Sequence, residues 1–174
     1  MKKQSLRQLA AGGVIAAAYA ALSLAIAPIA FGVVQCRVSE AFTLLPVLSP
    51  SAIWGVTLGC AITNAVGVST GANFLGAMDI VFGTLATLVA AVCSRALGRI
   101  RWNGLPLLSA LPPILVNAAV LGTEWCWAMT GGINATYWLL AGQIALGQLL
   151  PCLLGTLLVT TLEERGLQHL IEGK

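Results

Sequence analysis

The stretch Gln35-Cys36-Arg37-Val38-Ser39-Glu40-Ala41-Phe42 places an arginine and a glutamate three residues apart, where one long apolar run ends and the next begins. Apolar residues make up 58% of the chain and charged residues 9%, and the mean hydropathy is +0.91. A charged side chain in such surroundings is costly unless it lies at an interface, lines a cavity or has a partner. The few charged residues are therefore the first candidates for function.

The composition predicts an all-α integral membrane protein. A soluble domain would carry about a quarter charged residues. A membrane span needs about 20 apolar residues, so this length accommodates about six transmembrane helices with short connections. No segment has the polar character of a soluble domain, so we expect residues 1–174 to form a single transmembrane domain. The first apolar run is longer than the ~7–15 residues of a secretion signal, and Pro28 follows it, so we expect a retained helix.

The basic residues predict the topology. Apart from Arg37, they form three groups, namely Lys2, Lys3 and Arg7, then Arg95, Arg99 and Arg101, and finally Arg165 and Lys174. The positive-inside rule puts all three groups, and with them the N and C termini, on the cytoplasmic side. No basic face with interleaved aromatic residues accompanies these groups, so the sequence gives no support for nucleic-acid binding.

Six apolar segments are expected to be helical, at about 9–27, 39–48, 51–66, 77–96, 105–129 and 136–162. The second is too short to cross ~30 Å at 1.5 Å per residue. Either it extends backward through Arg37 or it covers only part of the membrane. Six segments return the chain to the side where it began, in agreement with the basic residues. Trp102 suits the inner interface, and an outer aromatic belt would comprise Trp125, Trp127 and Trp138.

The acidic residues Glu40, Asp79 and Glu124 fall near the outer ends of three different expected helices. Each could merely cap a helix or face headgroups, and Asp79 in a first turn suits the helix dipole in any case. Arg37 could likewise form a self-neutralising pair with Glu40. Amides could tie helices together, but beside three acids they predict a polar pocket for a planar polar ligand; they are Asn64, Asn73, Asn117, Gln143 and Gln148.

Small residues recur every four positions in the first segment, at Gly13, Ala17, Ala21 and Ala25, with Gly12, Ala16 and Ala20 beside them. This spacing makes a flat helix face that another backbone can approach closely. The face could serve a partner protein or internal packing. We expect the Gly55-x-x-x-Gly59 spacing of the third segment to serve internal packing.

Several activities find no support in the sequence. The five cysteines are scattered without a C-x-x-C pair and His169 is the single histidine, so no metal site is expected. A disulfide between Cys36 and Cys126 stays open. There is no phosphate-binding G-x-x-x-x-G-K-[ST] loop, no HExxH motif and no haem motif. We expect neither an enzyme nor a cofactor.

Three blocks carry a resemblance to a known family. They are Arg37-Val38-Ser39-Glu40-Ala41 continuing to Leu45-Pro46, the run from Asp79 to Ala86, and Pro112-Pro113-x-x-x-Asn117. The chain resembles the queuosine-precursor transporter family (QueT), a class of substrate-binding S components of energy-coupling factor (ECF) transporters. Gly147-Gln148 stands where many relatives are expected to carry Gly-Glu, so the resemblance assigns Gln148 no ligand role.

The resemblance implies an S-component-like helical bundle in the plasma membrane. It would capture a queuosine precursor, a 7-deazaguanine such as 7-aminomethyl-7-deazaguanine or queuine, from outside. Its partners would be a transmembrane coupling protein, docked on Gly13, Ala17, Ala21 and Ala25, and two ATPase subunits. Carboxylates can accept hydrogen bonds from the guanine-like N–H groups, and a second acid, Asp79, would meet an exocyclic amine.

The expected substrate-binding residues are Arg37, Glu40, Asn64, Asn73, Asp79, Asn117, Glu124 and Gln143. Two alternatives stay open. One is an S component for another vitamin-like solute. The other is an ion-coupled secondary transporter whose acids relay protons, although no inverted repeat between the halves is evident.

Overall fold

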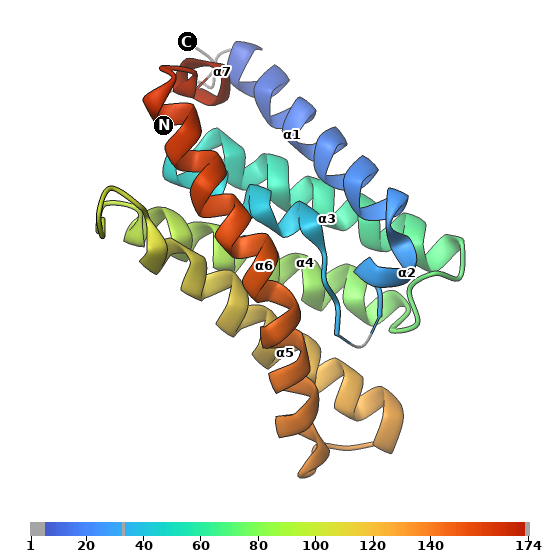
Figure 1. Ribbon diagram of the computed structural model, residues 1–174. Coiled ribbons are helices and arrows are strands. Elements are labelled where there is room, and N and C mark those ends of the chain that lie inside the picture. The colour runs from blue at the N-terminus through green and yellow to red at the C-terminus, as the bar shows by residue number, and fades with distance from the viewer. Residues whose placement is uncertain (1–5, 33, 173–174) are drawn as a thin grey trace.

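The computed structural model describes residues 6–32 and 34–172, and within them the chain is helical with no strand. The helices follow one another with short connections (Figure 1). They are α1 (Leu6–Ala25), α2 (Ala27–Ala30), the 3₁₀ helix η1 (Val38–Val47), α3 (Ser51–Ser69), α4 (Ala77–Leu97), the 3₁₀ helix η2 (Leu107–Ala110), α5 (Leu111–Thr130), α6 (Thr136–Glu164) and α7 (Gln168–Glu172).

In the described residues, five helical segments are long and apolar enough to cross a membrane, with η2 and α5 counted together. The remaining expected segment, at about 39–48, is η1, a 3₁₀ helix of 10 residues. At about 2.0 Å per residue it covers roughly 20 Å, which is only part of a bilayer. The backbone at Arg37 is extended, with φ −95° and ψ 95°. The second segment therefore does not extend backward as a helix through Arg37, and its length covers only part of a membrane.

Proline positions account for most differences at the expected helix ends. The first helix stops at Ala25, and α2 begins separately with Pro28 in its first turn. The expected helix 105–129 is divided, because Pro106 precedes η2 and Pro112 stands in the first turn of α5. Proline lacks an N–H donor and restricts the residue before it, so it favours the start of a helix over its interior.

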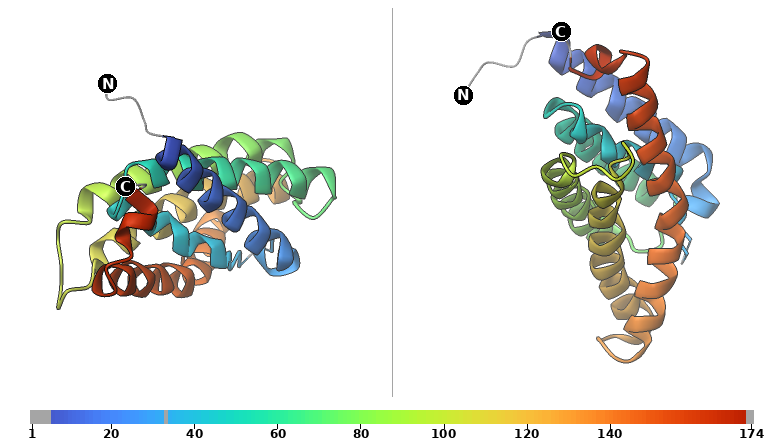
Figure 2. Two further views of the ribbon diagram at one scale, coloured as in Figure 1. Left: turned by 90° about the horizontal axis from the view of Figure 1, so that it is seen from above. Right: turned by 60° about the vertical axis from the view of Figure 1, so that its left-hand side comes forward.

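The short helix η1 lies inside the bundle. It contacts α1, α3, α4 and α6, and these helices enclose it in the views of Figures 1 and 2. A Cβ atom on Gly155 of α6 would lie 2.6 Å from the carbonyl oxygen of Ala41. Only glycine at that position lets the backbone of η1 approach α6 so closely.

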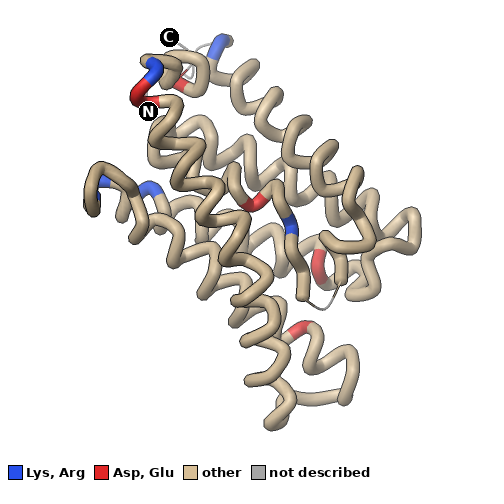
Figure 3. Tube along the Cα trace, viewed as in Figure 1, with Lys and Arg blue, Asp and Glu red and all other residues tan. Residues whose placement is uncertain are grey.

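The basic residues at the end of α4, in the connection after it and near the C-terminal end lie toward one end of the molecule, while the acidic residues of η1, α4 and α5 lie away from it (Figure 3). Two contacts hold that end together. Arg101 forms a bidentate ion pair with Glu163 of α6 at 2.8 and 2.9 Å, and Arg95 donates to the carbonyl oxygen of Pro46 at 2.7 Å. This clustering agrees with the expected topology, and the cytoplasmic assignment stays a prediction from the positive-inside rule.

Candidate functional site

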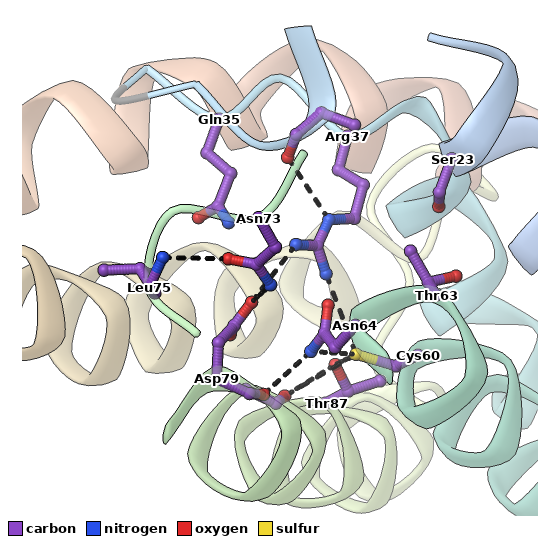
Figure 4. Close-up of polar contacts among 12 residues, drawn as sticks. Ser23, Gln35, Arg37, Cys60, Thr63, Asn64, Asn73, Leu75, Asp79 and Thr87 are labelled. Atoms are coloured by element: carbon purple, nitrogen blue, oxygen red, sulfur yellow. Dashed lines mark hydrogen bonds and ion pairs between the residues drawn. The ribbon is translucent and has the colours of Figure 1, made fainter. Parts of the chain in front are cut away.

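Arg37 lies at the centre of a buried polar cluster, on the extended segment that leads into η1. Its side chain is 3% exposed, and the guanidinium lies 5.1 Å from the ring centroid of Phe31. Nε donates to the carbonyl oxygen of Ala30 at 3.4 Å, and Nη2 lies 3.8 Å from Oδ2 of Asp79 (Figure 4). A buried cation needs such partners, because the interior does not solvate it.

Asp79 lies in the first turn of α4 and has contacts with α3, with the connection between α3 and α4, and with the segment that carries Arg37. Its Oδ2 accepts from Asn73 at 2.6 Å, and its backbone oxygen accepts from Asn64 of α3 at 2.8 Å (Figure 4). A Cβ on Gly83, one turn later, would collide with the Asp79 carboxylate and the Asn64 amide. Glycine at this position therefore allows the amide and the carboxylate to lie against α4.

A second group surrounds Glu40, which is 1% exposed. The Tyr19 hydroxyl of α1 donates to its Oε1 at 2.5 Å, and the hydroxyls of Ser23 and Ser39 make a further contact between α1 and η1. Asn117 of α5 lies beside the same carboxylate. Charge attraction between Glu40 and Arg37 links this group to the first.

Several buried polar atoms of these groups and their neighbours have no hydrogen-bond partner among the described residues. They are Oε1 of Gln35, Nη2 of Arg37, Oε2 of Glu40, Oδ1 of Asn64, Oδ1 of Asp79, both carboxylate oxygens of Glu124, Nε1 of Trp125 and Oε1 of Gln148. Buried polar groups are almost always paired in folded proteins. Their concentration here provides both donors and acceptors for a polar ligand.

Glu124 and Trp125 approach the cluster from the C-terminal part of α5. Glu124 lines a groove of about 350 Å³ with Met78 and Phe82 of α4, and the charges of Asp79 and Arg37 act on its carboxylate. Trp125 was expected in an outer aromatic belt, and that expectation is wrong. The side chain is 5% exposed and stacks on Phe74 at 5.8 Å between ring centroids. The connection between α3 and α4 covers it, whereas Trp127 and Trp138 are exposed.

The structure brings together seven of the eight expected substrate-binding residues and places Gln143 apart. Gln143 is half-buried in an apolar groove beside Trp138 and Leu139. Gln148 instead points inward and donates to the backbone oxygen of Gln35 at 3.4 Å. Gln35, Gln148, Tyr19 and Trp125 are cluster residues that the sequence reasoning missed or left out. Gln35 belongs to the stretch that carries Arg37 and Glu40, and Gln148 is an amide within an apolar helix, so these two had a signal in the sequence; Tyr19 and Trp125 had none.

The small residues of α1 separate into two faces. Gly13, Ala17, Ala21 and Ala25 are exposed, and nothing lies within 4 Å of a Cβ built on Gly13. The neighbouring Gly12 and Ala16 pack against α3. A Cβ atom on Gly55 would lie 2.8 Å from the carbonyl oxygen of Gly12, and one on Gly59 would lie 2.9 Å from that of Ala16. Internal packing therefore uses Gly12 and Ala16 and leaves the expected docking face uncovered.

The five cysteines are free thiols, so no disulfide joins Cys36 to Cys126. Cys60 lies within the cluster, where it accepts hydrogen bonds from Thr87 at 3.2 Å and from Arg37 at 3.7 Å. Within residues 6–32 and 34–172, no group of three or more His, Cys, Asp and Glu side chains is placed to hold a metal ion.

A bundle of membrane-crossing helices around a buried cluster of unpaired polar atoms is the architecture of a membrane transporter for a small polar solute. The comparison with protein families agrees, because the QueT transporter family matches residues 9–164. The chain belongs to the QueT transporter family and is a multi-pass protein of the plasma membrane. No curated protein and no solved structure matches it.

Proposed function

We propose that this protein is the substrate-binding subunit, or S component, of an ATP-driven ECF importer and that it captures a queuosine precursor from outside the cell. The observation that carries the proposal is the set of unpartnered polar atoms between η1, α3, α4, α5 and α6, in a member of the QueT transporter family. The ligand would be a 7-deazaguanine such as 7-aminomethyl-7-deazaguanine, or queuine.

The chemistry of the cluster suits such a ligand. Oε2 of Glu40 is free to accept from the guanine-like N–H groups, while Nη2 of Arg37 can donate to the ring carbonyl. Trp125 would stack on the ligand in place of Phe74, which now stacks on it at 5.8 Å between ring centroids. Asp79 already accepts from Asn73, whereas both oxygens of Glu124 lack partners. We therefore assign the exocyclic amine of the ligand to Glu124, in place of Asp79.

The exposed face of α1 supports a role for partner proteins. We propose that Gly13, Ala17, Ala21 and Ala25 meet the transmembrane coupling protein, which with two ATPase subunits would drive release inside. Replacing Ala17 with Leu places a branched side chain on a face that needs close backbone approach. The variant should bind ligand normally and lose co-purification of the partner subunits. Ala128→Leu, at an exposed position near the end of α5, is the matched control.

The decisive experiment on the ligand compares binding of 7-aminomethyl-7-deazaguanine with that of its neutral nitrile analogue by isothermal calorimetry. Glu40→Gln should weaken both ligands tenfold or more, since a mismatched buried hydrogen bond costs about 1–3 kcal/mol. Glu124→Gln should weaken the amine much more than the nitrile. Glu164→Gln, an exposed acid at the opposite end of the bundle, should change neither. Equal binding of both ligands to wild type and variants would refute the assignment.

Uptake in proteoliposomes tests the transporter class. Uptake should require the partner subunits and ATP. Uptake by this chain alone on an ion gradient would contradict the S-component proposal and favour a secondary transporter that uses its buried acids as a proton relay.

A further inference from the structure

A groove of about 720 Å³ lies at the end of the bundle where the basic residues gather. Its walls come from the C-terminal part of α4, the connection that follows it and the end of η1. Arg95, Arg99 and Arg101 line it together with Val47 and Val92. The groove shares no lining residue with the ligand cluster.

The three guanidinium groups have different partners. Arg95 is held by the backbone oxygen of Pro46, and Arg101 is paired with Glu163. Arg99 is exposed and has no ion pair with any described residue. Of these three cations, Arg101 alone is paired with a carboxylate among the described residues, so the groove has an excess of positive charge. Planar guanidinium groups suit the bidentate recognition of phosphate oxygens.

Apolar side chains border the charged groove. Ile100 and Trp102, on either side of Arg101, are 52% and 73% exposed, and Val89 and Val92 are exposed along α4. A tryptophan beside arginines is typical of the level where headgroups meet hydrocarbon. A phosphate bound to the arginines would thus have apolar surface next to it for acyl chains, which a free anion cannot use.

We propose that this groove binds the phosphate of an anionic phospholipid from the adjacent leaflet, with the acyl chains lying along α4. The positive-inside rule predicts that leaflet to be the cytoplasmic one, which carries anionic lipids and attracts basic segments close to its surface. The lipid would bridge Arg99 and Arg101 and would compete with Glu163 for the latter.

Native mass spectrometry of the detergent-solubilised protein tests the proposal with phosphatidylglycerol and phosphatidylcholine as the two probes. Phosphatidylglycerol should bind at least about tenfold more tightly. Arg99→Gln should weaken it about fivefold, the loss expected for one basic residue at an anionic surface, and leave phosphatidylcholine binding unchanged. Glu163→Gln removes the competing carboxylate and should strengthen phosphatidylglycerol binding severalfold. Because these side chains are exposed or half-buried, the variants should fold.

Arg165→Gln is the matched control, since Arg165 is exposed at the same end but does not line the groove. It should change phosphatidylglycerol binding less than twofold. An equal loss with Arg165→Gln would show that surface charge, and not the groove, attracts the lipid. Equal binding of the two lipids would overturn the proposal. Displacement of phosphatidylglycerol by millimolar inorganic phosphate would overturn it as well, because the groove would then recognise phosphate without the acyl chains.

Discussion

Replacing Tyr19 with Phe removes one hydroxyl from the contact between α1 and the ligand cluster. The Tyr19 hydroxyl donates to Oε1 of Glu40 at 2.5 Å, and both side chains are buried. Oε2 of Glu40 has no partner, so the variant leaves the carboxylate without this donor in a dry interior. A hydrogen bond to a charged group contributes about 1.5–3 kcal/mol. We expect a loss of unfolding free energy near the upper end of that range, because water cannot reach the buried carboxylate to replace the lost hydroxyl.

Thermal or denaturant unfolding of the purified protein in detergent measures this loss. The chain has two tyrosines, and the half-buried Tyr137 packs edge-to-face on Trp138. Tyr137→Phe is therefore the matched control and should cost less than 0.5 kcal/mol, as expected for changes away from buried networks. If Tyr19→Phe unfolded like the wild type, Glu40 would not depend on this hydroxyl, and the proposed link between α1 and the cluster would be wrong.

Five further variants have expected outcomes in the same unfolding assay. Asp79→Asn should cost about 3 kcal/mol or more, because it leaves the buried Arg37 without one of its counter-charges, and the double variant Arg37→Met/Asp79→Asn should recover part of the loss. Gly55→Ala should cost about 1–3 kcal/mol by overpacking the contact between α1 and α3, whereas Gly13→Ala should cause no loss of stability, because nothing lies within 4 Å of its Cβ and alanine favours the helix. Glu163→Gln should cost at most about 1 kcal/mol, since its ion pair is partly exposed. A larger loss of stability with Gly13→Ala than with Gly55→Ala would mean that the two faces of α1 are assigned the wrong way round.

Hydropathy and charge placement were sufficient to predict the helical membrane fold, because long apolar runs and rare charges are direct consequences of the bilayer. They could not predict that η1 is a 3₁₀ helix. Its conformation accompanies close backbone contact with Gly155 of α6, more than 100 residues later. Local sequence does not report such distant packing.

Part of the candidate site could be predicted, because charged residues are rare in this apolar chain. Arg37 and Asp79 stand out because a buried charge needs a partner, and the structure places them 3.8 Å apart. Gln143 and Gln148 have the same side chain and lie on one helix. Composition therefore cannot tell that Gln143 lines an apolar groove whereas Gln148 contacts Gln35. The prediction that Trp125 belongs to an aromatic belt was wrong, because its burial depends on the connection between α3 and α4, where Phe74 stacks on it.

The distribution of polar atoms along the bundle has a consequence for how a solute could cross. Toward the basic end, η1 packs apolar side chains such as Leu44 against Cys152 and Val159 of α6, and the ion pair of Arg101 with Glu163 spans that end. This apolar packing closes the bundle between the polar cluster and the basic end. A solute bound in the cluster, as proposed above, would leave toward the basic end only after this packing had opened or the whole protein had changed its orientation in the membrane.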